Sequence, residues 1–145
     1  MARFVLLSLL SAALVPAAPP ASAEPAPAFR VIVNPANPAD KLDKHFVADA
    51  FLKKRTRWGD DRAIQPVDLG EKASARGAFS RDVLGRDVVS VRRYWAQLVF
   101  SGRGVPPREL ANDSDVVRFV ATHSGAIGYV AAGAALAGVK TVEID

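Results

Sequence analysis

The chain has 145 residues, of which 50% are hydrophobic and 23% are charged, and its formal net charge is +4. This length is enough for one domain with one hydrophobic core and too short for two. The chain has no cysteine, which excludes disulfides and thiolate chemistry. Its small basic excess is interspersed with acidic residues, which argues against nucleic-acid binding.

The amino-terminal region has the pattern of a secretory signal peptide. Arg3 supplies a positive charge, Phe4 to Val15 is apolar, and Ala21-Ser22-Ala23 resembles a cleavage site. Cleavage after Ala23 predicts a periplasmic or secreted bacterial protein that meets a membrane, if at all, through a transporter. The predicted boundaries are 1–23 for the signal peptide, 24–28 for a Pro/Ala linker and 29–145 for the domain.

The first predicted elements are a strand over Phe29–Val33 and an amphipathic helix. Asn34 to Pro38 ends the strand, because its two prolines disfavour both ladder hydrogen bonds and helix. The helix begins at Asp40 or Asp43 and carries an apolar stripe. We expect His45, beside that stripe, to be a surface or core-edge residue.

The central stretch, Ile64 to Leu84, predicts a strand, a tight loop and a helix. The strand covers Ile64–Leu69, with Pro66 among its first residues or at a sheet edge. We expect Ser74 to cap the helix and Gly85 to adopt the left-handed conformation after its end. A loop from a strand to a helix N-terminus presents unpaired N–H groups and a positive dipole end, which is a general anion site.

The second half predicts two more helices and two strands. Asp87 caps the first helix, Ser101–Pro107 is a loop, and Asn112 to Ser114 caps the second helix. Buried and alternating patterns then predict strands over Ala126–Val130 and Val139–Ile144. Because strands alternate with helices, the pattern favours a three-layer α/β domain with a mixed central sheet.

Three segments resemble the PstS-like phosphate-binding proteins of ABC transporters, which have the type 2 periplasmic-binding fold. Phe51 to Trp58 (FLKKRTRW) is similar to the family's IFLGK-x-T-x-W segment, and Gly125 to Val130 (GAIGYV) to its PGAIGYV strand. Ser101 to Gly104 lies where that family has a glycine-rich loop. The resemblance implies an oxyanion-binding protein, and the length implies one lobe where family members have two.

The resemblance also places the family's phosphate loop, R-x-D-x-S-G-T, within Val67 to Phe79. With Phe79 on the family's aromatic residue, the acidic position falls on Glu71, whereas Leu69 replaces the arginine and Ala73 and Ala75 replace the hydroxyl residues. Loss of the guanidinium and hydroxyls predicts weak or altered oxyanion binding. The candidate ligand-binding residues are Glu71, Lys72, Ser74 and Arg76.

Two functions stay open, and a third is disfavoured. The first is a phosphate-type solute-binding protein reduced to one lobe. The second is a structural or interaction module that meets another chain or a second copy through the face left without a lobe, including Val105 to Pro107. An enzyme is disfavoured because the sequence has two histidines and lacks a nucleophile elbow or a metalloprotease motif. We expect no cofactor and no metal.

Overall fold

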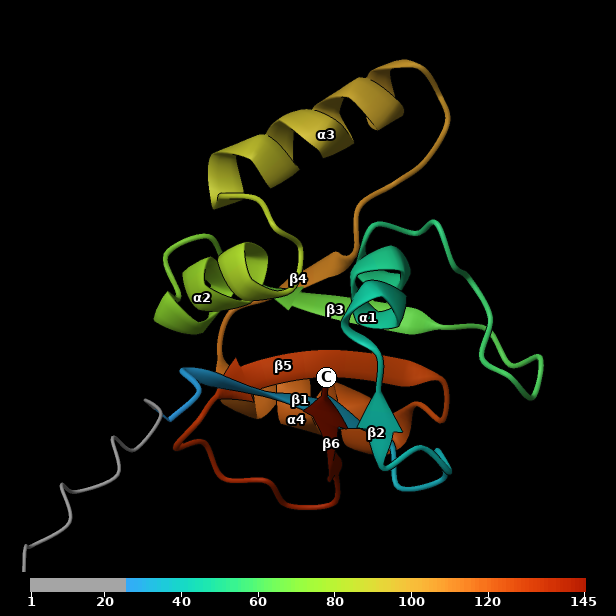
Figure 1. Ribbon diagram of the computed structural model, residues 1–145, viewed down its shortest axis with the longest axis vertical. Coiled ribbons are helices and arrows are strands. Elements are labelled where there is room, and N and C mark those ends of the chain that lie inside the picture. The colour runs from blue at the N-terminus through green and yellow to red at the C-terminus, as the bar shows by residue number, and fades with distance from the viewer. Residues whose placement is uncertain (1–25) are drawn as a thin grey trace, which may run out of the picture.

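The computed structural model describes residues 26–145, so the predicted signal peptide and its cleavage site lie outside the described residues. The described part holds four helices and one six-stranded sheet (Figure 1). In chain order the elements are β1 (Phe29–Val33), β2 (Lys41–Leu42), α1 (Lys44–Phe51), β3 (Gln65–Leu69), α2 (Ser74–Asp82), α3 (Val88–Phe100), β4 (Arg108–Leu110), α4 (Asp113–Thr122), β5 (Ala126–Ala131) and β6 (Lys140–Ile144).

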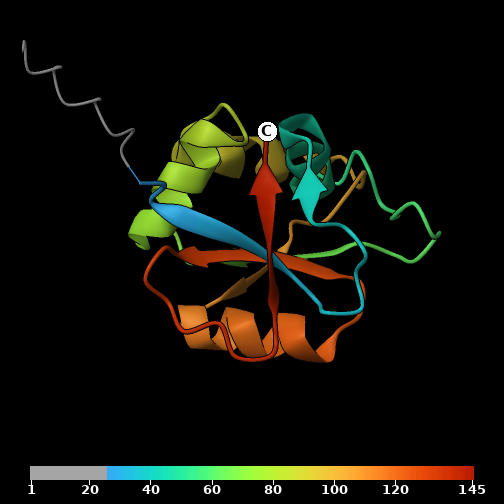
Figure 2. The same cartoon turned by 60° about the horizontal axis from the view of Figure 1, so that its bottom comes forward.

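The sheet is mixed, with strand order β2-β6-β1-β5-β3-β4. β1 runs antiparallel to both neighbours, β5 and β6, while the other pairings are parallel. α4 covers one face of the sheet, and α1 and α2 cover the other (Figure 2). α3 packs on α2 and lies farther from the sheet (Figure 1). The predicted three-layer α/β domain with a mixed central sheet is therefore confirmed.

Local signals placed most helix starts correctly and one incorrectly. Asp43 caps α1 through its side chain, Asp87 caps α3 and Asn112 caps α4. The prediction that Ser74 caps α2 is wrong, because Ser74 is already helical and the cap residue is Ala73, whose methyl group accepts no hydrogen bond. The N-terminus of α2 therefore lacks a side-chain acceptor.

Two short strands were missed by the sequence pattern. β2 has two residues and β4 has three, and both are rich in charged side chains, so neither shows the apolar alternation that marks a strand. The helix α2 ends at Asp82, two residues before the predicted Leu84. Gly85 has a φ of 63°, which is the left-handed conformation expected after that helix.

An aromatic cluster fills the core between the sheet and the α1–α2 layer. Phe79 stacks on Tyr129 with ring centroids 4.0 Å apart, and Phe51 lies 4.7 Å from Phe79. All three side chains are buried. On the opposite face of the sheet, Gly128 lets α4 approach, because a Cβ there would lie 2.8 Å from Val116 Cγ1. A glycine at position 128 is therefore required for the close packing of α4 on the sheet.

Candidate functional site

The loop between β3 and α2 lies at the carboxyl end of β3. It spans Gly70–Ala73, and the Gly70 N–H donates to the Leu110 carbonyl at the end of β4, 3.2 Å away. The Ala73 N–H donates back to the Gly70 carbonyl, which closes the turn. The first amides of a helix have no intrahelical acceptor, and here no side chain of the cap residue replaces it. The positive end of the α2 dipole is therefore uncapped at this loop.

The four predicted ligand residues fall into two environments. Lys72 and Ser74 are exposed beside the N-terminus of α2. Glu71 is also exposed and accepts from Arg92 of α3, with 3.1 Å between Arg92 Nη1 and Glu71 Oε2. Arg76 is different, because only 4% of it is exposed. The structure thus gathers three of the four at the surface and places the fourth inside the domain.

Arg76 belongs to a buried polar network that joins α2 to the sheet. Its Nη1 lies 2.9 Å from Asp68 Oδ1 and donates to the Leu69 carbonyl at 2.5 Å. Asp68 also accepts from the Tyr129 hydroxyl and from the Leu69 N–H. The Arg76 Nε has no hydrogen-bond partner in the described structure. The guanidinium of Arg76 therefore neutralises an internal carboxylate.

Burial sets the ionisation of this network. Removal from water raises the pKa of Asp68 to about 6, although Arg76, the Tyr129 hydroxyl and the Leu69 N–H all favour the charged carboxylate. Burial and the neighbouring Asp68 raise the pKa of Tyr129 above its usual range. The phenol therefore stays protonated and donates to Asp68 in the ordinary pH range.

Sequence reasoning missed Asp68 and Tyr129 as polar partners, although a signal was present. Asp68 interrupts a run of buried residues in β3, where an unpaired carboxylate would be costly. Arg76 and Ser80 fall on one helical stripe with Phe79 and Val83, and all four are buried. A charged residue on an otherwise buried stripe indicates an internal ion pair.

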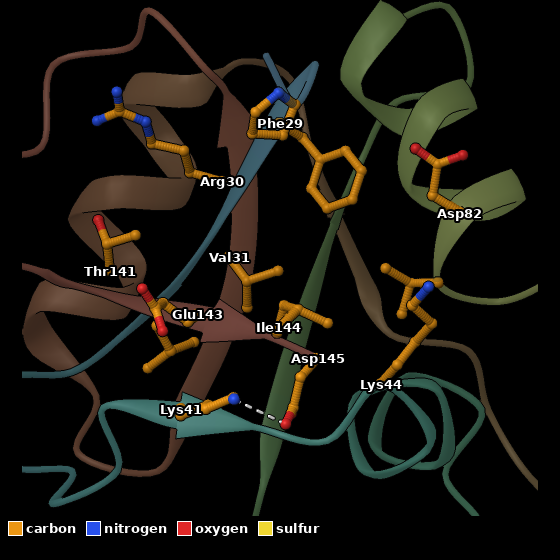
Figure 3. A pocket seen from close by; sticks show the side chains of 13 residues that line it. Phe29, Arg30, Val31, Lys41, Lys44, Asp82, Thr141, Glu143, Ile144 and Asp145 are labelled. Atoms are coloured by element: carbon orange, nitrogen blue, oxygen red, sulfur yellow. Dashed lines mark ion pairs between the residues drawn. The ribbon is translucent and has the colours of Figure 1, made fainter. Parts of the chain in front are cut away.

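Three cavities of about 660, 390 and 380 Å³ lie elsewhere in the domain, and none of these three is lined by a residue between Gly70 and Arg76. The largest lies beside the start of β1 and the end of β6 (Figure 3). The second includes His123, whose Nδ1 lies 2.8 Å from the Phe119 carbonyl and whose ring stacks on Phe119. His45 is exposed, as predicted.

Within residues 26–145, no three histidine or acidic side chains come together as a possible metal site. In the same part of the chain, no helix has both the length and the apolar character that crossing a membrane requires.

The comparisons with known proteins identify the fold. No protein-family model and no curated protein matches the sequence. Among solved structures, the chain is similar to a candidate phosphate ABC transporter substrate-binding protein from Clostridium perfringens with bound phosphate, with a TM-score of 0.64 and 20% identity over 81% of this chain and 45% of that chain. It is also similar to an ABC-type phosphate transport receptor from Vibrio cholerae (TM-score 0.62, 18% identity, 81% and 46%) and to PstS from Borrelia burgdorferi (TM-score 0.62, 10% identity, 81% and 47%).

These matches show that the domain has the fold of part of a phosphate-type periplasmic binding protein. The chain spans about 45% of the length of the first matched structure, which is consistent with a single lobe. The resemblance proposed from the sequence is thereby confirmed at the level of fold. The sequence identity to these three structures is 20% or less, which shows the fold and does not identify a ligand for this chain.

Proposed function

We propose that this chain is an exported solute-binding module that binds an oxyanion weakly at the N-terminus of α2. The observation that carries the proposal is the uncapped start of α2 with Lys72 and Ser74 exposed beside it. Backbone amides, a hydroxyl and an ammonium group are suitable donors for phosphate or sulfate. The protein partner of such a module would be a transporter in the membrane that receives the solute.

Weak binding follows from the geometry of the loop. Glu71 places a carboxylate in the same loop, and its pairing with Arg92 offsets that negative charge only in part. The Nη1 of Arg76 is engaged by Asp68 and the Leu69 carbonyl. An anion on this exposed loop also keeps much of its water, so the protein replaces only part of its hydration shell.

Titration calorimetry with phosphate, sulfate and chloride tests the proposal. Lys72→Ala and Ala73→Asp should both weaken binding of phosphate and sulfate, because the first removes a cation and the second fills the helix N-terminus with an internal carboxylate. Lys54→Ala, at an exposed lysine three residues after the end of α1, is the matched control and should bind as the parent chain does. Submicromolar affinity, or equal binding by all variants, would contradict the proposal.

A second candidate function is an interaction module that associates with another copy of the chain. Within the described residues, the exposed large hydrophobic side chains all fall on α3 and the loop after it: Val89, Val99, Phe100 and Val105. Phe100 is 95% exposed. Side chains of this size on one continuous segment are typical of a protein contact surface.

Sedimentation velocity over a range of concentrations tests this candidate. We expect a dimer that Phe100→Ser disrupts, since large aromatic side chains dominate such contacts. Ala137→Ser, an exposed position outside this segment, is the control. A chain that remains monomeric at every concentration would exclude self-association.

A further inference from the structure

Helix α3 carries apolar side chains on two opposite sides. Val91 and Trp95, on its inner side, are buried in the core. On its outer side, exposed residues recur at the spacing of one helical stripe, and these form the outer stripe: Val89, Arg93, Ala96 and Phe100. A surface helix ordinarily has polar residues on its outer side, so large apolar side chains there indicate a contact surface.

The outer stripe is most exposed at its carboxyl end. Phe100 is the last residue of α3, and 95% of it is exposed. Val99 beside it and Val105 in the following loop are exposed as well. Gly102 has a φ of 68°, so the chain turns away from the helix directly after Phe100. Because α3 lies at one end of the described domain, away from the sheet, this apolar end is open to the surroundings (Figure 1).

The charge around the outer stripe is positive. From the start of α3 to the start of β4, the sequence has four arginines and no acidic residue. Arg93 lies on the stripe, and Arg103 follows it in the loop. Two acidic side chains lie beside α3: Glu71 pairs with Arg92 at 3.1 Å, and Asp87 caps the start of the helix. The carboxyl end of α3 and its loop therefore combine exposed apolar side chains with positive charge.

We propose that α3 docks on the negatively charged surface of a lipid bilayer through the outer stripe. Arg93 and Arg103 lie beside the anionic headgroups, while the side chains of Val99 and Phe100 insert among the adjoining acyl chains. Basic residues together with exposed apolar side chains on one helix are typical of surfaces that bind anionic membranes. The helix lies on the bilayer and does not span it, since it has 13 residues.

A second copy of the chain is the competing occupant of this surface. In such a pair the two outer stripes would face each other and bring the arginines of both copies together, whereas the stripe supplies no carboxylate. Like charges that face each other oppose association, and an anionic surface removes that cost. Charge therefore favours the bilayer over a second copy. The loop at Gly70–Ala73 is a separate site, so oxyanion binding and bilayer docking can fail independently.

A fluorophore that responds to its surroundings tests the proposal on the full chain. The chain has no cysteine, so Ala96→Cys gives a single labelling site on the outer stripe, and Ala137→Cys, at an exposed loop position, is the control. Emission from the label at position 96 should shift to the blue with vesicles of phosphatidylglycerol and phosphatidylcholine, and it should not shift with phosphatidylcholine alone. The label at position 137 should shift with neither.

Three results would overturn the proposal. They are no shift at position 96 with the anionic vesicles, an equal shift with the neutral vesicles, and a shift that rises with protein concentration when no vesicles are present. The last result would place a second copy on the outer stripe. Attachment through another part of the chain, including the predicted signal peptide, is common to both labelled chains and does not produce a difference between them.

Vesicle titrations of variants of the Ala96→Cys chain measure the two contributions. Arg93→Gln should weaken binding about fivefold, which is the loss expected for one basic residue near an anionic surface. Phe100→Ser should weaken it about tenfold, because a large apolar side chain no longer leaves water. Arg118→Gln, on α4 across the sheet, is the charge-matched control and should bind as the labelled parent does. Equal weakening by both arginine variants, or unchanged binding by Phe100→Ser, would also overturn the proposal.

Discussion

Replacing Arg76 with methionine should destabilise the domain in a pH-dependent manner. Methionine is similar in length and apolar, so the main change is that the Asp68 carboxylate loses its cation while remaining 4% exposed. Removal of one partner of a buried ion pair leaves an uncompensated charge. The pKa of Asp68 in the folded chain then rises from about 6 to a higher value.

The size of the effect follows from linkage. An acid whose pKa is higher in the folded state than in the unfolded state lowers the free energy of unfolding as pH rises between those two values. In the parent chain, the contribution of Asp68 therefore falls until about pH 6 and is constant above it. In Arg76→Met the loss continues above pH 6 at about 1.4 kcal/mol per pH unit, which gives about 2 kcal/mol at about pH 7.5. The lost hydrogen bond to the Leu69 carbonyl adds about 1 kcal/mol at every pH.

Urea unfolding of the two chains at about pH 7.5 and about pH 5 measures this difference. We expect a loss of about 3 kcal/mol at the higher pH and about 1 kcal/mol at the lower, where Asp68 is protonated in both folded chains. Arg81→Met, on the exposed side of the same helix, is the control and should show neither loss. An equal loss at both pH values would refute the assigned role of the Asp68 charge.

Three further changes test the packing and capping described above. Tyr129→Phe should cost about 1–3 kcal/mol by calorimetry, because the buried Asp68 loses a donor while the ring stacking is retained. Gly128→Ala should cost about 1–3 kcal/mol in urea unfolding, since the new methyl group meets the α4 side chains, whereas Gly133→Ala, with nothing within 4 Å, should be neutral. Asn112→Ala should lower the melting temperature through a loss of about 1 kcal/mol of α4 capping, and an unchanged melting temperature would contradict the capping role.

The fold was predictable where local signals are strong. The apolar runs at β1 and β5 and the caps Asp43, Asp87 and Asn112 follow from the identities of a few adjacent residues. The short strands β2 and β4 are set by their neighbours in the sheet, since two or three charged residues carry no pattern of their own. Strand order depends on contacts distant in sequence and was likewise not predicted.

The candidate site was predictable in position but not in composition. Proximity in sequence suggested that Lys72, Ser74 and Arg76 act together. The helix separates them, because Ser74 is exposed while Arg76, two positions later, is turned toward Asp68. The partner that decides the role of Arg76 is Asp68 on the preceding strand, which is not among the predicted site residues.

The position of β1 between β5 and β6 determines when the domain can assemble during synthesis. Both partners of β1 lie about 100 residues later in the sequence, so the emerging chain carries an apolar strand with two unpaired edges until β5 and β6 have been synthesised. Contacts so distant in sequence also slow folding. Until then, the unpaired edges of β1 are open to pairing with other chains, which is a route to aggregation.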